Sequence, residues 1–339
     1  MSSHPRIITS YLTKGSRMLL QSITERTWYL PGANNLGVVT TGAGGAIAID
    51  TGLDKDTGRL LRKALDAAGL TLQAIISTHH HADHIGGNSY LLRNIPDIQV
   101  YAPPLEAALI EHPILEPIYL NHGASPTAAL RTRWLLAQGT PVHQRIGDLE
   151  RINKGDPFDL QVAGVSLEII PLPGHSIAQV GVAYDGVCFA ADGFFGPAVL
   201  ARHGVPYAHD VAAQLASLER LAARCSPPCG RGDRGRDIWF LPGHGPLVAC
   251  EDMPAMLASN RAAITQSSSS VLRALHQPGT LDVITGRVLR ALGQELAGIP
   301  QYVIFAGAIA AHLTYLEQQG LVQAVLEEQG ITWRSNVER

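Results

Sequence analysis

The feature that most constrains the fold of this chain is residues 77–87, which read STHHHADHIGG. They follow the apolar run at residues 74–76, which is typical of a short buried strand. Because a strand points alternate side chains to the same face, His79 and His81 are expected to project together while His80 points away. Two imidazoles on one face at the end of a strand predict a metal site at the edge of a sheet.

Asp83 and His84 extend this group at the point where the strand ends. The pair Gly86-Gly87 that follows allows the backbone to turn closely into a helix. Neutral imidazole nitrogens and carboxylate oxygens are the ligands that Zn²⁺ prefers in proteins. The stretch therefore predicts two adjacent sites for first-row metals.

Two metal ions need more ligands than this stretch supplies, and the chain offers three more. His175, Asp192 and His244 each come directly after an apolar run. Open sheets place their binding residues at the ends of strands in this way. A single histidine in a loop is usually structural or solvated, so the interpretation depends on the whole set occurring in this order.

The first part of the chain alternates between strand and helix patterns that Gly, Asn and Pro residues separate. Strands are expected at residues 17–30, 36–41, 46–50, 74–77 and 99–102, and a helix at 56–68. Further on, hairpins are expected at residues 158–172 and 179–191, followed by a helix that Asp210 caps and a strand at 237–241. Residues 103–145 interrupt this pattern and are interpreted as a lid inserted over the site, not as framework.

From about residue 250 the pattern changes to helices. Residues 1–249 are therefore expected to form a catalytic domain, with the lid at about 103–145, and residues 250–339 a helical C-terminal domain. Its expected elements are helices at 253–276, 281–292 and 301–319 and strands at 322–326 and 331–334. This order of elements resembles a winged helix.

The charge distribution argues against a nucleic-acid partner. The formal net charge is −3, and residues 255–339 hold six arginines, six acidic residues and no lysine. The helix that would enter a groove is apolar around residues 303–311. We expect this helix to be buried against the catalytic domain near the lid, or in a homodimer, because exposed apolar patches of this kind normally mark an interface.

Neither a signal peptide nor an uninterrupted apolar run of about 18 residues is found. We therefore expect a cytoplasmic protein without a membrane segment. Cys225 and Cys229 are separated by three residues, with Cys250 further on. A zinc clip, a disulfide and loop cysteines without a role all remain open for them.

Taken together, the motif His79-His80-His81-Ala82-Asp83-His84 and the later His175, Asp192 and His244 resemble the metallo-β-lactamase superfamily, whose signature is H-x-H-x-D-H. The resemblance covers about residues 17–249. It implies an α+β fold, a four-layer αβ/βα sandwich that holds its metals at one edge.

The resemblance also implies a ligand set. It assigns His79, His81 and His175 to one metal, Asp83, His84 and His244 to the other, and Asp192 to both. Two Zn²⁺ ions are expected, with Fe or Mn as alternatives because availability competes with affinity. Asp50, which follows an early strand, is expected to support the histidine-rich loop by hydrogen bonds without binding metal.

The activity that the resemblance implies is metal-dependent hydrolysis of a small molecule. A hydroxide that bridges the metals would attack an ester-type bond, a thioester or lactone ahead of a β-lactam, and Asp83 could pass a proton to the leaving group. Alternatives are a phosphodiesterase or ribonuclease, a mononuclear iron sulfur dioxygenase, and a non-catalytic binding protein on the same scaffold.

The substrate is not defined by these motifs. The variant with His80 and Gly86-Gly87-Asn88 is similar to glyoxalase II, but the basic substrate-binding residues of that enzyme have no match here. The aromatic and imidazole side chains expected to line a pocket near the metals are Tyr119, Phe194, Phe195, Tyr207 and His209.

Overall fold

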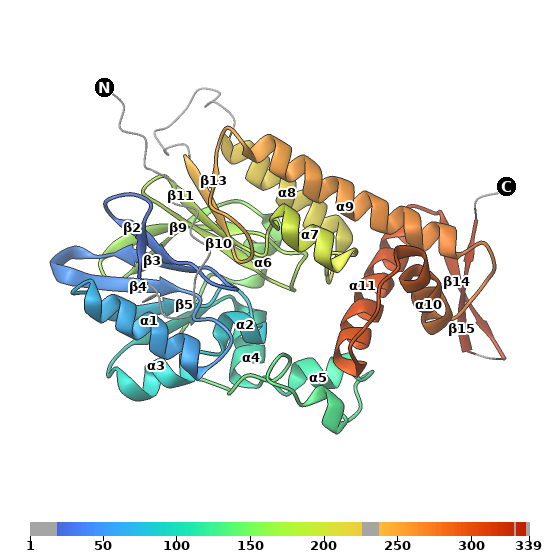
Figure 1. The fold of residues 1–339 in the computed structure, drawn as a ribbon, viewed down its shortest axis with the longest axis horizontal. Helices are drawn as coiled ribbons and strands as arrows, with labels where there is room; N and C mark the ends of the chain where they lie inside the picture. Colours follow the sequence, from blue (N-terminus) through green and yellow to red (C-terminus); the bar gives the residue numbers. More distant parts are fainter. Residues whose placement is uncertain (1–18, 226–236, 329, 337–339) are drawn as a thin grey trace.

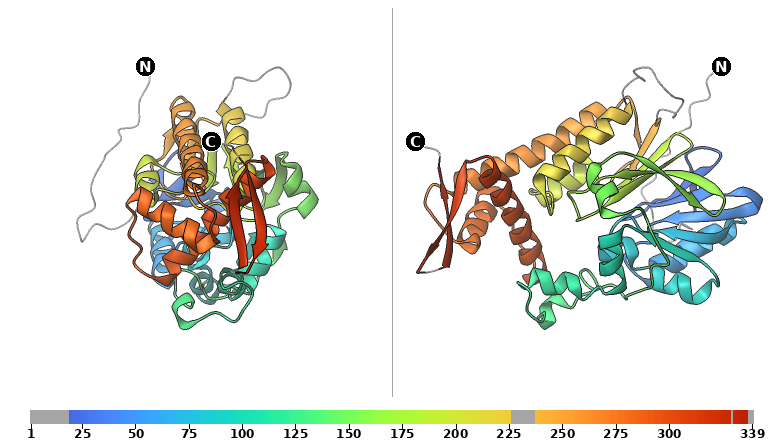
Figure 2. Two further views of the ribbon diagram at one scale, coloured as in Figure 1. Left: turned by 90° about the vertical axis from the view of Figure 1, so that its right-hand side faces the viewer. Right: turned by 180° about the vertical axis from the view of Figure 1, so that it is seen from behind.

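The computed structural model describes residues 19–225, 237–328 and 330–336. Two β-sheets stack face to face, and helices cover the outer side of each sheet (Figure 1). This arrangement is the predicted four-layer sandwich. The helices that follow residue 280 lie at one end of it, and the chain's C-terminal hairpin lies beyond them (Figure 2).

The first sheet has the strand order β1-β2-β3-β4-β5-β6-β7. Its strands are β1 (Gln21–Ser22), β2 (Thr27–Leu30), β3 (Leu36–Thr40), β4 (Gly45–Ile49), β5 (Thr71–Ile76), β6 (Gln99–Ala102) and β7 (Gln144–Arg145). Pairing is antiparallel from β1 to β4 and parallel from β4 to β7. The histidine-rich stretch therefore leaves the sheet from an inner strand, β5, where α/β proteins commonly place binding residues.

The second sheet has the order β13-β12-β11-β10-β9-β8. Its strands are β8 (Phe158–Val162), β9 (Val165–Pro171), β10 (Val180–Tyr184), β11 (Val187–Ala191), β12 (Trp239–Pro242) and β13 (Val248–Ala249). The predicted hairpins are confirmed. Their turns, Ala163-Gly164 and Asp185-Gly186, have positive φ at both residues, as a tight hairpin turn with the twist of the strands requires.

The space between the sheets is filled by apolar side chains from both. Ile47, Ile49 and Ile76 of the first sheet belong to one buried cluster with Val182 and Phe189 of the second. Both faces of the inner strands are covered, which is why β4 and β11 are buried throughout.

Helices cover the outer faces. On the first sheet lie α1 (Lys55–Ala67) and α3 (Asn88–Asn94), which follows the short α2 (Ala82–Ile85), and on the second lie α8 (Val211–Cys225) and α9 (Met253–Ala274). Leu61, Ala64 and Leu65 form the buried face of α1, and the Asp54 side chain caps its first turn. Two shorter helices, α6 (Leu149–Lys154) and α7 (Pro197–His203), lie in connections.

The insertion at residues 103–145 is only partly a lid. It contains α4 (Pro104–Glu111), α5 (Leu115–Leu120) and the 3₁₀ turn at Ala128–Leu130, before it ends in β7. Ala107 and Ile110 of α4 are fully buried in the core beneath the first sheet, and β7 pairs with β6. The interpretation of the whole segment as an insertion outside the framework is therefore wrong for its two ends.

The C-terminal part consists of α9, α10 (Leu281–Leu292), α11 (Ile299–Gln318) and a hairpin of β14 (Val322–Glu327) and β15 (Gly330–Ser335). Helix α11 packs on α9 and α10, and it also contacts α8 and the α5 region of the insertion (Figure 1). The predicted position of this helix, against the catalytic part and near the lid, is confirmed. The winged-helix resemblance and the domain boundary near residue 249 stay predictions.

By length and composition alone, α11 is apolar enough to cross a membrane, with a mean hydropathy of 1.3. It is the one helix of this kind among the described residues. Buried helices of soluble proteins pass the same test, so the observation carries little weight.

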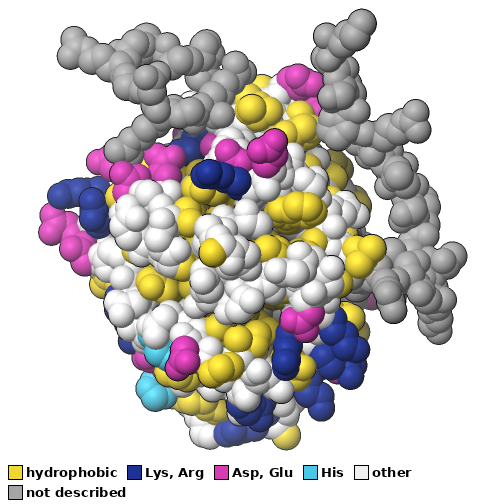
Figure 3. All heavy atoms as spheres, turned by 90° about the vertical axis from the view of Figure 1, so that its left-hand side faces the viewer, with side chains coloured by type: hydrophobic (Ala, Val, Ile, Leu, Met, Phe, Trp, Pro, Cys, Tyr) yellow, Lys and Arg dark blue, Asp and Glu magenta, His cyan; other side chains and the backbone are white. Residues whose placement is uncertain are grey.

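On the face at the left-hand side of Figure 1, acidic, basic and apolar side chains are interspersed (Figure 3).

Candidate metal centre

Four strand ends bring the predicted ligands together. The segment after β5 carries His79, His81, Asp83 and His84, while His175, Asp192 and His244 follow β9, β11 and β12. At β11 a register irregularity and a positive φ of 47° at Ala191 turn the chain just before Asp192. All of these ligands except His81, Asp83 and His244 are buried.

Three ring nitrogens meet in the first group. The Nδ1 atom of His81 lies 3.1 Å from Nε2 of His79 and 2.9 Å from Nε2 of His175. Burial lowers the pKa of all three imidazoles, so each ring is neutral and has one nitrogen without a proton. Three converging lone pairs that share no proton match the requirements of a metal ion.

A second group consists of Asp83, His84 and His244, whose ligand atoms lie within 4.8 Å of one another. His244 Nε2 is 3.2 Å from Asp83 Oδ2. The carboxylate of Asp192 lies between the groups, with Oδ2 3.2 Å from His175 Nε2 and 3.6 Å from His244 Nε2. The seven predicted ligands are thus collected in one place, as two groups that share one carboxylate.

Asp50 organises the histidine-rich loop, as predicted. Its carboxylate accepts hydrogen bonds from the backbone N and the hydroxyl of Thr78, both at 2.8 Å, and from His84 Nδ1 at 2.8 Å. Because Nδ1 of His84 donates to Asp50, its Nε2 carries the free lone pair. The expectation that Asp50 hydrogen-bonds the loop is confirmed.

Two further histidine ligands are oriented in the same way by backbone carbonyls. Nδ1 of His175 lies 3.1 Å from the carbonyl of Tyr207, and Nδ1 of His244 lies 2.8 Å from that of Ala33. Each contact assigns the proton to Nδ1 and leaves Nε2 facing the other ligands. Together with Asp50 at His84, three groups far apart in the sequence therefore fix the tautomers that metal binding needs.

The centre contains buried polar atoms that a bound metal ion would satisfy. Among the described residues, His84 Nε2 and Asp192 Oδ1 have no hydrogen-bond partner, although they face each other at 3.5 Å. Burial would raise the pKa of Asp192, but His244, His84 and His175 hold it well below its usual range. A Cβ atom at Gly243 would lie 2.4 Å from Asp192 Oδ1, so glycine is required there. The donor set fits metal ions.

A carboxylate that the motif analysis missed supports the loop from the other side. Glu106, on α4, is fully buried and accepts from the backbone N of His80 at 3.0 Å and from His80 Nδ1 at 2.5 Å. Its other oxygen accepts from Ser176 Oγ and Ala178 N, both at 2.7 Å. Glu106 thereby ties the His79–His81 segment to the loop of His175. In the sequence, the one sign of this role was that Glu106 is an acidic residue within a largely apolar helix.

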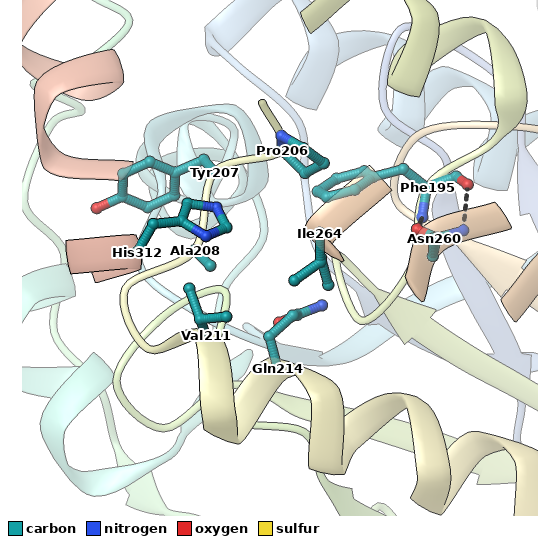
Figure 4. Close-up of a pocket in the computed structure, with 9 residues that line it drawn as sticks. All are labelled: Phe195, Pro206, Tyr207, Ala208, Val211, Gln214, Asn260, Ile264 and His312. Atoms are coloured by element: carbon teal, nitrogen blue, oxygen red, sulfur yellow. Dashed lines mark hydrogen bonds between the residues drawn. The ribbon is translucent and has the colours of Figure 1, made fainter. Parts of the chain in front are cut away.

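Two asparagines hold the loops of the other ligands. The amide of Asn35 donates to the carbonyls of Pro242 and Gly245, at 2.9 and 2.8 Å, on both sides of His244. Asn260 of α9 accepts from the backbone N of Phe195 at 2.8 Å and donates to its carbonyl at 2.9 Å (Figure 4). The C-terminal helices therefore help to shape the segment after Asp192.

The predicted pocket residues divide into two sets. Phe195 and Tyr207 flank the centre, because both rings lie 5.6 Å from the ring of His175. They also line a small pocket with His312 and Gln214 (Figure 4). The hydroxyl of Tyr119 lies 3.3 Å from His80 Nε2.

Phe194 and His209 do not line the centre as expected. Phe194 is fully buried in the core between the second sheet and α8 and α9. The side chain of His209 is exposed, and its backbone N donates to Gly174 at 2.7 Å. Both expectations failed because the turn after Asp192 and the loop before α8 set side-chain direction, which no periodic pattern predicts.

A second acidic side chain at the centre was also missed. Glu116 of α5 is 7% exposed, and its carboxylate lies within 4.8 Å of ring nitrogens of His80 and His81. Burial raises its pKa to about 7; His80 opposes this, and Asp83 and Glu106 add to it. Of the cysteines considered for a clip, Cys250 points its Sγ at the carbonyl oxygen of Cys225, at 3.6 Å, and Cys229 lies outside the described residues, so the alternatives for these cysteines stay predictions.

The profile of the metallo-beta-lactamase superfamily matches residues 29–224, which is more than half of the chain. The chain belongs to the metallo-beta-lactamase superfamily. Its two ligand groups lie where the motif of this superfamily predicts them.

Relatives of this superfamily member include hydrolases. A hydroxyacylglutathione hydrolase from Methylobacillus flagellatus is 26% identical over 251 residues, which cover 70% of this chain and 82% of that protein. Another from Aeromonas hydrophila is 31% identical over 159 residues, 47% of this chain and 46% of that protein. The chain thus spans most of the first relative and about half of the second.

A solved structure extends the likeness to the C-terminal helices. The crystal structure of a beta-lactamase domain protein from Burkholderia ambifaria superposes with a TM-score of 0.68 at 18% identity, over 95% of each chain. This likeness concerns the fold alone. The superfamily match, the ligand groups and the hydrolase relatives make this protein a metal-dependent hydrolase.

Proposed function

We propose that this protein is a dinuclear zinc hydrolase that cleaves a thioester bond in a small molecule. The observation that carries the proposal is the pair of ligand groups that share the carboxylate of Asp192. The second group argues for two metals because it is as complete as the first. A mononuclear iron dioxygenase would need only one group of ligands, because it binds one metal ion.

In this proposal, His79, His81 and His175 hold one ion and Asp83, His84 and His244 the other. Zinc bound there would supply a water molecule that ionises near pH 7 and a Lewis acid for the substrate carbonyl. Imidazoles with unprotonated nitrogens and carboxylates are the ligand types that zinc prefers. Iron and manganese remain alternative metals.

One of the chain's own residues, Asp83, would supply a proton to the leaving group of the substrate. Asp83 is the more accessible of the two ligand carboxylates, with its side chain 30% exposed against 5% for Asp192. Its Oδ2 atom also lies 3.3 Å from the amide nitrogen of Asn34, which limits its movement. Asp83 is therefore placed to hold a proton on the side open to solvent and to pass it to a leaving group.

A thioester is favoured over a lactone for two reasons. The relatives bear the name hydroxyacylglutathione hydrolase, and one of them is matched over 82% of its length. In addition, a thiol with a pKa of about 8.5 leaves with little protonation. A site whose candidate acid is a carboxylate with a lowered pKa suits such a leaving group better than an alkoxide.

Protein purified without added metal should contain about two zinc ions per chain by elemental analysis. A panel of thioesters, lactones, β-lactams and bis(p-nitrophenyl) phosphate should then give the highest kcat/KM for a thioester. His84→Ala should lose metal and activity, whereas His112→Ala, an exposed histidine in the insertion, should keep both. About one iron per chain without hydrolysis would favour the dioxygenase, and a preference for the phosphate diester would favour the phosphodiesterase.

A further inference from the structure

Glu116 is a buried carboxylate for which the described part of the chain supplies no side-chain hydrogen bond. It is 7% exposed and lies on α5 of the insertion. The neighbouring carboxylates of Asp50 and Glu106, by contrast, each accept several hydrogen bonds. Desolvating a carboxylate without a partner is costly, so such groups are normally matched by a donor or a cation.

The lysine and arginine side chains of the described residues do not supply that cation. The charged groups that act on its carboxylate are His80, Asp83 and Glu106, and no lysine or arginine of the described residues is among them. His80 is the one group that can be positive, and its Nδ1 is already 2.5 Å from Glu106. Two carboxylates thus face one imidazole, so the described side chains around Glu116 carry fewer positive than negative groups.

The arginines of the insertion are committed elsewhere. Arg133 lies 3.5 Å from the carboxylate of Asp54, and its guanidinium stacks over the ring of Trp134 at 5.1 Å. Arg131 donates through Nε to the carbonyl of Pro126. The insertion therefore presents its buried acid to the centre and directs these basic groups away from it.

Glu116 lies beside the group of ligands where a substrate would bind. Its carboxylate is within 4.8 Å of a ring nitrogen of His81, which belongs to the three-histidine group. Tyr119 follows Glu116 on α5, and its hydroxyl lies 3.3 Å from Nε2 of His80. The ring of Tyr207 lies 5.7 Å from that of His81. One carboxylate and two tyrosines therefore lie around the neighbouring rings of His80 and His81.

We propose that Glu116, together with Tyr119 and Tyr207, binds a positively charged ammonium group of the substrate. This inference rests on the proposed thioester hydrolysis and narrows its substrate class to thioesters with a cationic thiol part. The carboxylate pairs with the charge, and tyrosine rings also attract cations through their faces. In the reaction, the oxygen of water bonds to the acyl carbon, the C–S bond breaks, and the thiol leaves with a proton.

The inference separates this enzyme from a hydrolase of glutathione thioesters. Glutathione carries two carboxylates and a net negative charge, which Glu116 would repel. This expectation agrees with the absence, noted from the sequence, of a match to the basic substrate-binding residues of glyoxalase II. Selectivity of this kind acts through repulsion of the wrong substrate as much as through attraction of the right one.

The test uses three thioacetates of similar size that differ in charge: acetylthiocholine, its neutral isostere 3,3-dimethylbutyl thioacetate, and the anionic S-acetyl-3-mercaptopropionate. The zinc-loaded enzyme is assayed for released thiol, and kcat/KM is compared. We expect acetylthiocholine to exceed the neutral isostere by about tenfold, and the anion to be the poorest substrate. In Glu116→Gln the ratio of cation to neutral isostere should fall to about 1.

The matched control is Glu111→Gln, a carboxylate of the same insertion that accepts from Arg145 at 2.9 Å and should leave the ratio unchanged. The ratio is insensitive to a uniform loss of activity, so a partly destabilised variant remains informative. A ratio near 1 in the wild type, or an unchanged ratio in Glu116→Gln, would overturn the role of Glu116. If none of the thioesters is hydrolysed, the proposed function fails instead.

Discussion

Replacing Glu106 by glutamine tests whether this carboxylate holds the centre together. The carboxylate is fully buried and accepts from four donors at 2.5–3.0 Å: the N and Nδ1 of His80, the hydroxyl of Ser176 and the N of Ala178. Burial would lower the pKa of His80, but Glu106 more than offsets this and raises it. The two side chains therefore form a buried ion pair.

The amide of Glu106→Gln can still accept from Ser176 and Ala178 through its oxygen. Its NH₂ group, however, would face the two donors of His80, and the ion pair would be lost. Removing one partner of a buried pair typically costs about 3–5 kcal/mol. We therefore expect the free energy of unfolding to fall by that amount, which is a large part of the stability of a typical domain.

Urea unfolding of metal-free protein, followed by circular dichroism, measures this loss without a contribution from metal binding. Glu111→Gln serves as the control, because its ion pair with Arg145 is partly exposed and should contribute about 1 kcal/mol or less. A loss below about 1 kcal/mol in Glu106→Gln would refute the reasoning. It would mean that His80 and Glu106 share no ion pair in the folded protein.

Asp50→Asn should lower zinc affinity about 10–100-fold, measured by competition with a chelator, because the bond that orients His84 is weakened; unchanged metal content and turnover would count against this role. Burial lowers the pKa of His312 to about 4, so the unfolded chain takes up this proton first, and stability should fall as the pH drops from about 6.5 towards 4. His312→Asn should reduce the loss between pH 7 and pH 5 by about 2 kcal/mol; an equal loss in both proteins would exclude His312 as the cause. Asn260→Ala should lower the free energy of unfolding by about 1–3 kcal/mol by urea denaturation, since it leaves the backbone N and carbonyl of Phe195 unpaired; a change within 0.5 kcal/mol would show that water replaces the amide.

The ligands could be recognised in the sequence because each one depends on a local pattern. An apolar run predicts a buried strand, and a polar residue directly after it predicts a side chain at the edge of the sheet. His175 and His244 lie in two separate loops. They still come together, because the strand ends that carry these loops meet at one edge of the sheet. The supporting role of Asp50 was predictable on the same ground, because it follows β4, which pairs with β5.

The supporting and recognition residues depended on tertiary structure. Glu106 and Ser176 are 70 positions apart, and Phe195 and Asn260 are 65 apart, so no local spacing relates them. Phe194 and Phe195 are neighbours of the same type, yet one fills the core of the second sheet and the other flanks His175. Backbone direction in the turn after Asp192 separates them. Likewise, only the packing of α5 against the centre turns Glu116 from an ordinary helix residue into a buried carboxylate to which no described side chain donates a hydrogen bond, because desolvation is a property of the folded surroundings.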